Sequence, residues 1–298
     1  MDNRFTLQFI VSEDGKLLRE AIAAWGISKR ALTSIKFDGG DILVNGEERN
    51  VRHVLSKGDS VSIIFPPEVV SEGLVAEYGE LDIVYEDEAL MIINKPPYMS
   101  TIPSREHPTS SVANYIRGDF EQQNIASTVH IVTRLDRDTS GLMCIAKHRH
   151  IHHLMSEQQK AGNVHREYEA IVHGIVEKDQ SIIVPIGRKD TSIIEREVRE
   201  DGQFAHTDVK VLATVSEPLA MSHIRLKLYT GRTHQIRVHM GHIGHPLVGD
   251  ELYGGSRACI DHQALHCVSL QFVHPVTKKK MNFYSEVLEQ MAKLINNK

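Results

Sequence analysis

The chain has few cysteines, only short apolar runs and no apolar segment at its N-terminus. Cys144, Cys259 and Cys267 form no CxxC pair, so we expect free thiols in a reducing cytosol rather than a disulfide framework or a zinc ribbon. The apolar runs extend over a handful of residues, whereas a membrane span needs about 20, which excludes an integral membrane protein. The first residues include acids and do not resemble a secretory signal, so we expect a cytoplasmic protein.

One segment of the chain has no lysine or arginine, and its acids mask the positive net charge of the remaining residues. Glu68 to Leu90 contains eight acids and no lysine or arginine. Since the net charge of the whole chain is −5, the remainder carries +3. Ile224 to Asp250 alone contains four basic residues against one acid. The overall acidity is therefore compatible with a basic face that binds nucleic acid.

Two adjacent prolines, Pro66 and Pro67, indicate a domain boundary. Proline cannot donate to a sheet ladder and restricts the residue before it, so the boundary is placed near residue 70. A length of 298 residues at about 150 per domain also suggests two domains. We therefore divide the chain into 1–70 and 71–298.

The first domain has a pattern of two helices and several short strands. The apolar spacing predicts a helix over Lys16–Ala24, ended by Gly26, and a second helix that Ser28 caps. Strands and tight turns are expected at Phe5–Val11, Ile42–Val44, Asn45-Gly46, Lys57–Asp59 and Val61–Phe65. With its Ser28-Lys29 start and its VNG turn, SKRALTSIKFDGGDILVNGEERNVRHVLSKGDSVSI resembles the small RNA-binding domain first described in ribosomal small-subunit protein four.

That resemblance implies that the two helices hold structured RNA, with Lys29 and Arg30 among the contacts. Ser12 to Ser60 contains eight basic and eight acidic residues, so the domain should bind RNA weakly by itself. The alternative is a small helical-plus-hairpin domain that packs on the second domain.

The segment RLDRDTSGL, Arg134 to Leu142, holds two aspartates among arginines. The apolar LMCIA stretch at its end predicts a buried strand, which places the charged residues at the end of a sheet. Neighbouring cations favour the ionised form of Asp136, and a held, ionised carboxylate can act as a nucleophile or as a base. The residues alone choose neither between these roles nor between Asp136 and Asp138. The alternative is a surface loop with ordinary ion pairs, worth about 0–1 kcal/mol each.

Tyr168 lies in a predicted strand from Arg166 to Gly174, on the face that carries small residues. A flat base could stack on its ring, at about 1–3 kcal/mol. The alternative is a core aromatic residue with a bonded hydroxyl group.

Arg237 falls inside a helix that we expect Thr233 to cap and that ends near Gly244-His245-Pro246. A half-buried arginine needs an anion, and Asp136 is the expected partner. The alternative is a solvent-facing arginine beside Arg232.

Eighteen histidines raise the question of a metal site. They include two clusters, His148–His153 and His234–His245, but no HExxH motif and no cysteine pair accompany them. The apolar stripe of the helix that follows His148 predicts that most imidazoles of the first cluster face solvent. We therefore expect no metal, and contacts to RNA or ordinary surface histidines instead.

Five segments in one order resemble the RluA-type pseudouridine synthases over about residues 80–284. They are MIINKPPYMSTIPS (91–104), RLDRDTSGL (134–142), REYEAIVHG (166–174), the strand after Ala205 and Thr207, and GRTHQIRVHMGHIGHPLVGDELYG (231–254). The nucleophilic aspartate of that family falls on Asp136, its active-site tyrosine on Tyr168 and its basic residue on Arg237. The chain departs from the family at Thr133, where histidine is usual, and at Tyr98, where glycine is frequent.

The resemblance implies an α+β fold, in which a mixed, mostly antiparallel β-sheet catalytic domain with a central cleft follows the small RNA-binding domain. It also implies an isomerase that flips a uridine out of RNA, at a cost of a few kcal/mol, and rejoins its base to the ribose through carbon 5. Arg134 and Arg137 would hold the RNA backbone, with Arg232 and His234 as further contacts.

No cofactor and no metal are implied, and we expect a monomer. Relatives that carry the N-terminal domain mostly modify large-subunit ribosomal RNA, which makes that RNA the expected partner and transfer RNA the alternative. Two rival interpretations are a non-catalytic RNA-binding or ribosome-assembly protein with the same fold, and a histidine-rich metallohydrolase.

Overall fold

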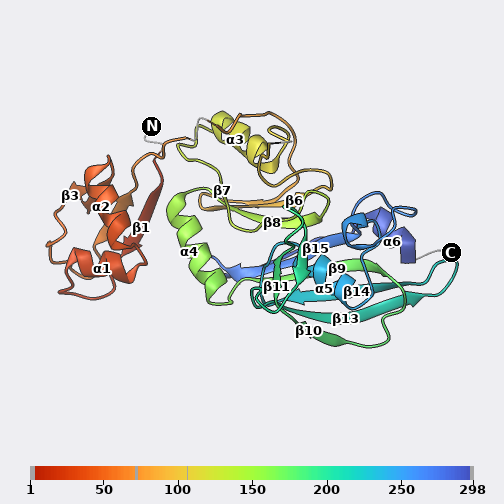
Figure 1. Ribbon diagram of the computed structural model, residues 1–298. Coiled ribbons are helices and arrows are strands. Elements are labelled where there is room, and N and C mark those ends of the chain that lie inside the picture. The colour runs from red at the N-terminus through yellow and green to blue at the C-terminus, as the bar shows by residue number, and fades with distance from the viewer. Residues whose placement is uncertain (1–3, 71–72, 106, 296–298) are drawn as a thin grey trace.

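The computed structural model describes residues 4–70, 73–105 and 107–295. Its N-terminal part is a four-stranded antiparallel sheet with two helices beside it (Figure 1). The sheet has the order β1-β4-β2-β3. Its elements are β1 (Thr6–Ile10), α1 (Leu18–Ala24), α2 (Lys29–Phe37), β2 (Asp41–Val44), β3 (Glu47–Glu48) and β4 (Ser60–Ile64).

Local sequence signals explain these elements. Ser28 caps α2, since its hydroxyl oxygen accepts a hydrogen bond from the Ala31 amide at 3.2 Å. Asn45 and Gly46 both adopt positive φ, as the tight turn between β2 and β3 requires. Ile22, Ile35 and their apolar neighbours form a core of their own between the helices and the sheet. The helices and strands expected here are present to within a few residues.

The rest of the chain is built on a ten-stranded sheet. The main path runs β10-β13-β14-β9-β15-β8-β6-β5, with β16 beside β15 and β7 beside β8. Most neighbours pair antiparallel, while β15 and β8 pair parallel. The strands are β5 (Ile83–Glu86), β6 (Leu90–Lys95), β7 (His130–Ile131), β8 (Ser140–Ala146), β9 (His165–His173), β10 (Gln180–Ile183), β13 (His206–Val215), β14 (Met221–Leu228), β15 (Leu265–Val273) and β16 (Lys280–Tyr284). The expected α+β fold with a mixed, mostly antiparallel sheet is confirmed.

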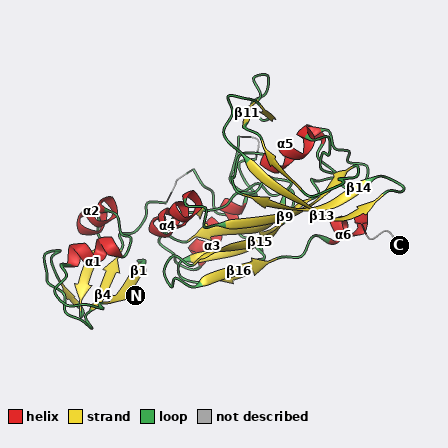
Figure 2. Ribbon diagram, turned by 90° about the horizontal axis from the view of Figure 1, so that it is seen from below, coloured by secondary structure: helices red, strands yellow, loops and turns green. Residues whose placement is uncertain are grey.

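Helices and one hairpin surround this sheet (Figures 1 and 2). They are α3 (Val112–Gln122), α4 (Arg149–Lys160), the hairpin β11 (Ile186–Arg188) and β12 (Arg196–Val198), α5 (Gln235–His242), the short 3-10 helix η1 (Glu251–Tyr253) and α6 (Glu289–Ile295). The hairpin projects from the body of the domain beside α5 (Figure 2). Among the helices of the described ranges, none is both long and apolar enough to cross a bilayer.

The N-terminal part meets the rest of the chain at the start of α4. The rings of Phe5 and Phe65 lie 4.7 and 4.9 Å from the ring of His148, and Phe65 also stacks on His150 at 4.9 Å. The expectation that most imidazoles of this cluster face solvent is wrong for His148 and His150, which are buried. Helical spacing cannot reveal that residues distant in sequence cover the first turn of a helix, as the two phenylalanines do here.

Glu68, which follows the two prolines, binds residues at the start of α4 and in β7. Its carboxylate accepts the amide hydrogen of Arg149 at 2.7 Å and lies 2.6 Å from His130 Nε2. Burial opposes the charge of this carboxylate, but the hydrogen bond and charge of His130 outweigh it and lower the pKa of Glu68 to about 2. The contact therefore holds an ionised carboxylate at neutral pH.

Candidate active site

The RLDRDTSGL segment forms the loop that leads into β8, and its last three residues begin that strand. The Thr101 hydroxyl donates to the Leu135 carbonyl at 2.7 Å, and the buried Lys95 ammonium donates to the Arg137 carbonyl at 3.0 Å. At Gly141 (φ +109°) a Cβ would lie 2.4 Å from the Cys267 amide nitrogen, so only glycine permits β8 to approach β15 this closely. These contacts fix the backbone on both sides of Asp136.

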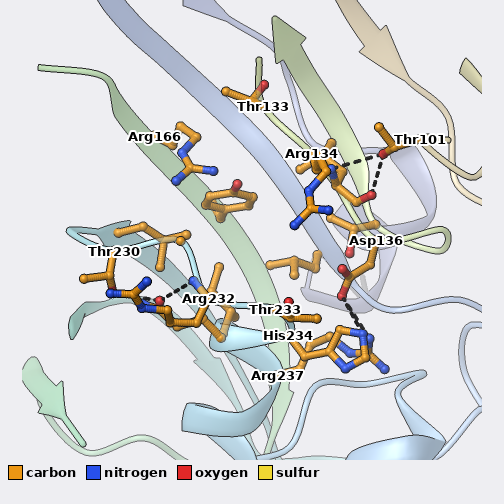
Figure 3. A pocket seen from close by; sticks show the side chains of 18 of the residues that line it. Thr101, Thr133, Arg134, Asp136, Arg166, Thr230, Arg232, Thr233, His234 and Arg237 are labelled. Carbon is orange, nitrogen blue, oxygen red and sulfur yellow. Dashed lines mark hydrogen bonds and ion pairs between the residues drawn. The ribbon is translucent and has the colours of Figure 1, made fainter. Parts of the chain in front are cut away.

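Asp136 lies in contact with Arg237. The Arg237 Nη1 donates to Asp136 Oδ2 at 2.9 Å, so the expected contact is present (Figure 3). The Arg237 side chain is 5% exposed and that of Asp136 31% exposed, which leaves the carboxylate accessible and its partner buried. Burial opposes the charge of Arg237, but the hydrogen bonds and charges of Asp250 and Asp136 outweigh it and raise its pKa. The guanidinium therefore stays charged.

A cavity of about 860 Å³ opens in front of this pair, within the usual range for ligand sites. It is lined by Asp136, Arg237 and Tyr168, among other residues. Tyr168 is buried on β9, where its neighbours across the strands are Leu226 and Cys267. Burial is the main cause that raises the pKa of Tyr168, so the phenol is neutral at ordinary pH. One cavity thus contains all three residues that the sequence indicated for chemistry.

The cavity wall is strongly basic. Of the described residues that line it, Asp136 is the one carboxylate, against six arginines: Arg134, Arg137, Arg166, Arg196, Arg232 and Arg237. Arg134 and Asp136 come from one side and Arg166 and Arg232 from the other (Figure 3). Guanidinium groups match phosphate oxygens in charge and geometry. The arrangement suits a polyanion that presents one group to Asp136.

The arginines differ in how they are held. Arg137 pairs with Asp138 at 3.1 Å, and Arg232 donates through Nε to the Phe204 carbonyl at 2.9 Å. Within the described ranges, the guanidinium groups of Arg134 and Arg166 form no hydrogen bond or ion pair. Arg166 was missed in the sequence, although a signal existed: it lies two residues before Tyr168 on the same face of one strand.

His234 also reaches the site, from a strained turn. It adopts the left-handed conformation (φ 57°) and precedes α5, where Thr233 was expected as the cap. Its Nδ1 lies 2.8 Å from the Tyr253 hydroxyl and its Nε2 3.7 Å from Asp136 Oδ2. The N-cap of α5 is therefore His234, one residue later than predicted. The turn before the helix is closed by the Gln235 side chain, which accepts the Arg232 amide hydrogen.

The remaining sequence candidates lie elsewhere or have other partners. Lys29 and Arg30 are exposed on α2, outside the cavity. No cluster of three or more metal-ligating side chains occurs in the described part of the chain. The Thr133 hydroxyl accepts the Cys144 amide hydrogen at 2.8 Å, and Tyr98 adopts positive φ (65°), a conformation that glycine adopts more readily.

Comparison with known proteins identifies the family. The pattern of the RNA pseudouridylate synthase family matches residues 89–242. An RNA pseudouridine synthase of Bacillus subtilis, YjbO, is 51% identical over 93% of this chain and 98% of its own length. The chain belongs to the RNA pseudouridine synthase family. It is therefore an isomerase that acts on uridine in RNA, and the similarity to RluA-type enzymes is confirmed.

Other relatives agree with this assignment. The ribosomal large subunit pseudouridine synthase D of Pseudomonas aeruginosa is 36% identical over 86% of this chain and 83% of its own. Among solved structures, human RNA pseudouridylate synthase domain containing 1 matches with a TM-score of 0.58 and 25% identity. That match covers 70% of this chain and 86% of the human one. The part of the chain that this match covers thus has the fold of a pseudouridine synthase.

Proposed function

We propose that this pseudouridine synthase acts on large-subunit ribosomal RNA and that Asp136, Tyr168 and Arg237 form its catalytic centre. One observation carries the proposal. Asp136 is the one carboxylate among the described residues of a basic cavity, and a buried guanidinium holds it at 2.9 Å. A polyanion drawn to the arginines would bring its flipped nucleotide to that carboxylate.

The reaction needs an accessible carboxylate beside the sugar. The bond between uracil nitrogen and ribose breaks, the base turns, carbon 5 bonds to the ribose, and the carbon-5 proton leaves while the nitrogen gains one. Arg237 occupies Asp136 Oδ2, and Oδ1 makes no hydrogen bond within the described chain. That free oxygen is the one that would attack the sugar or the base, or accept a proton. Since the raised pKa of Tyr168 keeps its phenol neutral, we assign it to stacking against the turning base.

The arginines of the wall would bind the RNA backbone on either side of the target. Arg134, Arg137, Arg232 and His234 were indicated by the sequence. Arg166 joins them because it lines the cavity and its guanidinium has no ion-pair partner among the described residues. Contacts to phosphate set the position of RNA without reading its sequence.

The N-terminal part would supply a second RNA contact. Its own core, from Leu7 to Phe65, ends where Pro66 and Pro67 begin, which supports a domain boundary near residue 70. Lys29 and Arg30 project from the first turn of α2, and the start of a helix attracts phosphate. We therefore assign residues 1–70 to RNA binding, and we assign the protein to the cytoplasm.

The target is tested by mapping pseudouridine in total RNA from cells with and without this protein. We expect a missing modification in large-subunit ribosomal RNA; a loss confined to transfer RNA would contradict the assignment. Catalysis is tested by tritium release from carbon-5-labelled RNA. Asp136→Asn should abolish release and keep RNA binding, whereas Asp138→Asn, its neighbour outside the cavity wall, should keep turnover. Full activity of Asp136→Asn would refute the catalytic centre.

A further inference from the structure

A second carboxylate holds Arg237 from behind. Asp250 Oδ2 accepts from Arg237 Nε at 2.7 Å and Oδ1 accepts from Nη2 at 2.9 Å, a two-point contact. The Asp250 side chain is 1% exposed and does not line the cavity. Arg237 is thus shared by a buried carboxylate that cannot reach RNA and by an accessible one that can.

The chain around Asp250 is built to keep it in place. A Cβ on Gly249 (φ +82°) would lie 1.9 Å from the His262 carbonyl oxygen, so the turn before Asp250 is closed by packing that only glycine permits. The Asp250 carbonyl accepts the Gly255 amide hydrogen at 2.8 Å. The Arg237 guanidinium carbon lies over the ring of Tyr253, 4.9 Å from the ring centroid, a cation–π contact.

In this geometry the N–H groups of Arg237 bind two different carboxylates. Nε and one Nη2 hydrogen are used by Asp250, and Nη1 is left to meet Asp136. A guanidinium held at two points cannot rotate, so its remaining donor group points at Asp136 before RNA arrives. Asp250 therefore fixes the orientation of the Arg237 guanidinium as well as stabilising its positive charge.

Charge balance during the reaction gives Asp250 a second task. If Asp136 bonds to the substrate or takes up a proton, it loses its negative charge, and Arg237 loses that anion. A buried guanidinium without an anion is strongly destabilised. Because Asp250 is buried and does not react, Arg237 remains paired through every step.

We propose that Asp250 is a positioning residue for the isomerase, which acts on Asp136 through Arg237. The proposal rests on the catalytic centre proposed above. It predicts that the effect of Asp250 on turnover depends on an arginine at position 237, since lysine cannot bind two carboxylates in this forked way. An aspartate with a purely structural role would have an effect independent of that arginine.

The experiment compares Asp250→Asn in two backgrounds by tritium release. In the otherwise native chain we expect kcat to fall about tenfold or more, with KM within about twofold. In the Arg237→Lys background the same change should alter kcat by less than about threefold. Asp87→Asn is the matched control: Asp87 is a partly buried carboxylate that pairs with His274 at 2.8 Å, away from the cavity, and its loss should leave kcat unchanged.

Two results would overturn the proposal: a kcat of Asp250→Asn within about twofold of the native value, or equal losses in both backgrounds. Should Asp250→Asn not fold, a crystal structure of Asp136→Asn decides. The Arg237 guanidinium is expected to stay on Asp250, and a guanidinium that has left Asp250 would refute the proposal. Full activity of Asp136→Asn would instead refute the catalytic centre itself, which separates the two failures.

Discussion

The contact between the N-terminal part and α4 should weaken in mild acid because it buries neutral imidazoles. Burial is the main cause that lowers the pKa of His148 and of His150 to about 4, from an ordinary 6.5. Glu68 opposes this shift at His148, whereas the positive charges of His130 and Arg149 add to it. At His150 the neighbours His148, His153 and Lys278 all act in the same direction as burial. Neither imidazole is therefore expected to accept a proton in the folded protein above about pH 4.

Stability falls with falling pH because the unfolded chain binds protons more readily than the folded chain. Between pH 6.5 and 4 the unfolded chain takes up protons that the folded chain refuses, so stability is full above 6.5 and falls as the pH drops. At pH 5 the pH lies 1.5 units below the unfolded pKa of each imidazole. At 1.4 kcal/mol per unit, each imidazole then lowers the free energy of unfolding by about 2 kcal/mol, and the two together by about 4 kcal/mol. Glu68 acts in a lower window, since its contribution is lost as the pH falls from 4.5 towards 2.

The assay is urea unfolding at pH 7.5 and pH 5 for the native chain and for a variant with His148→Asn and His150→Phe. Asparagine keeps the side-chain acceptor that His148 offers to the His150 amide, and phenylalanine keeps the stack on Phe65. All other histidines are present in both proteins, so the comparison isolates His148 and His150. The native chain should lose about 4 kcal/mol more than the variant between the two pH values. Equal losses would show that these imidazoles do not control the contact.

Three further predictions concern the cavity and the RNA-binding surface. Arg237→Met should strand the buried Asp250 carboxylate and lower the free energy of unfolding by about 3–5 kcal/mol, measured in urea; an unchanged value would contradict the pairing. Arg166→Ala should weaken RNA binding and reduce the slope of log affinity against log salt by about 1, while folding is unaffected; an unchanged slope would remove it from the backbone contacts. Replacing Lys29 and Arg30 by glutamate should reduce affinity for ribosomal RNA fragments in a filter-binding assay and leave tritium release at saturating RNA unchanged; unaltered affinity would exclude α2 from the RNA contact.

The elements of the N-terminal part could be predicted because local signals decide them. The serine cap at Ser28 and the Asn45-Gly46 turn act within a few residues, and the structure contains both. The strand order of the large sheet is different in kind. The parallel pairing of β8 with β15 joins residues more than a hundred positions apart, and periodicity contains no information about that partner.

The fate of the histidine cluster shows the same limit. The helix over Arg149–Lys160 and its apolar stripe were predictable, but which of its faces the N-terminal part covers was not. His148 and His150 became buried because Phe5 and Phe65, distant in sequence, pack on the first turn of α4. A pattern within one helix describes its own faces and leaves open what covers them.

Some residues of the candidate site could be predicted from the sequence and others could not. Asp250 is the clearest example of the second kind. Asp136, Tyr168 and Arg237 could be indicated because motifs that resemble the RluA-type family fall on them, whereas residue type alone left Asp136 and Asp138 equivalent. The cavity brings the three together. Asp250 stands inside the GRTHQIRVHMGHIGHPLVGDELYG segment, and from the sequence it was counted only as the one acid in the range Ile224 to Asp250. Its significance depends on two distances to Arg237 and on its burial, neither of which spacing reveals. A guanidinium with one accessible and one buried carboxylate can lose the first during reaction and remain paired, and this asymmetry is a property of the folded chain alone.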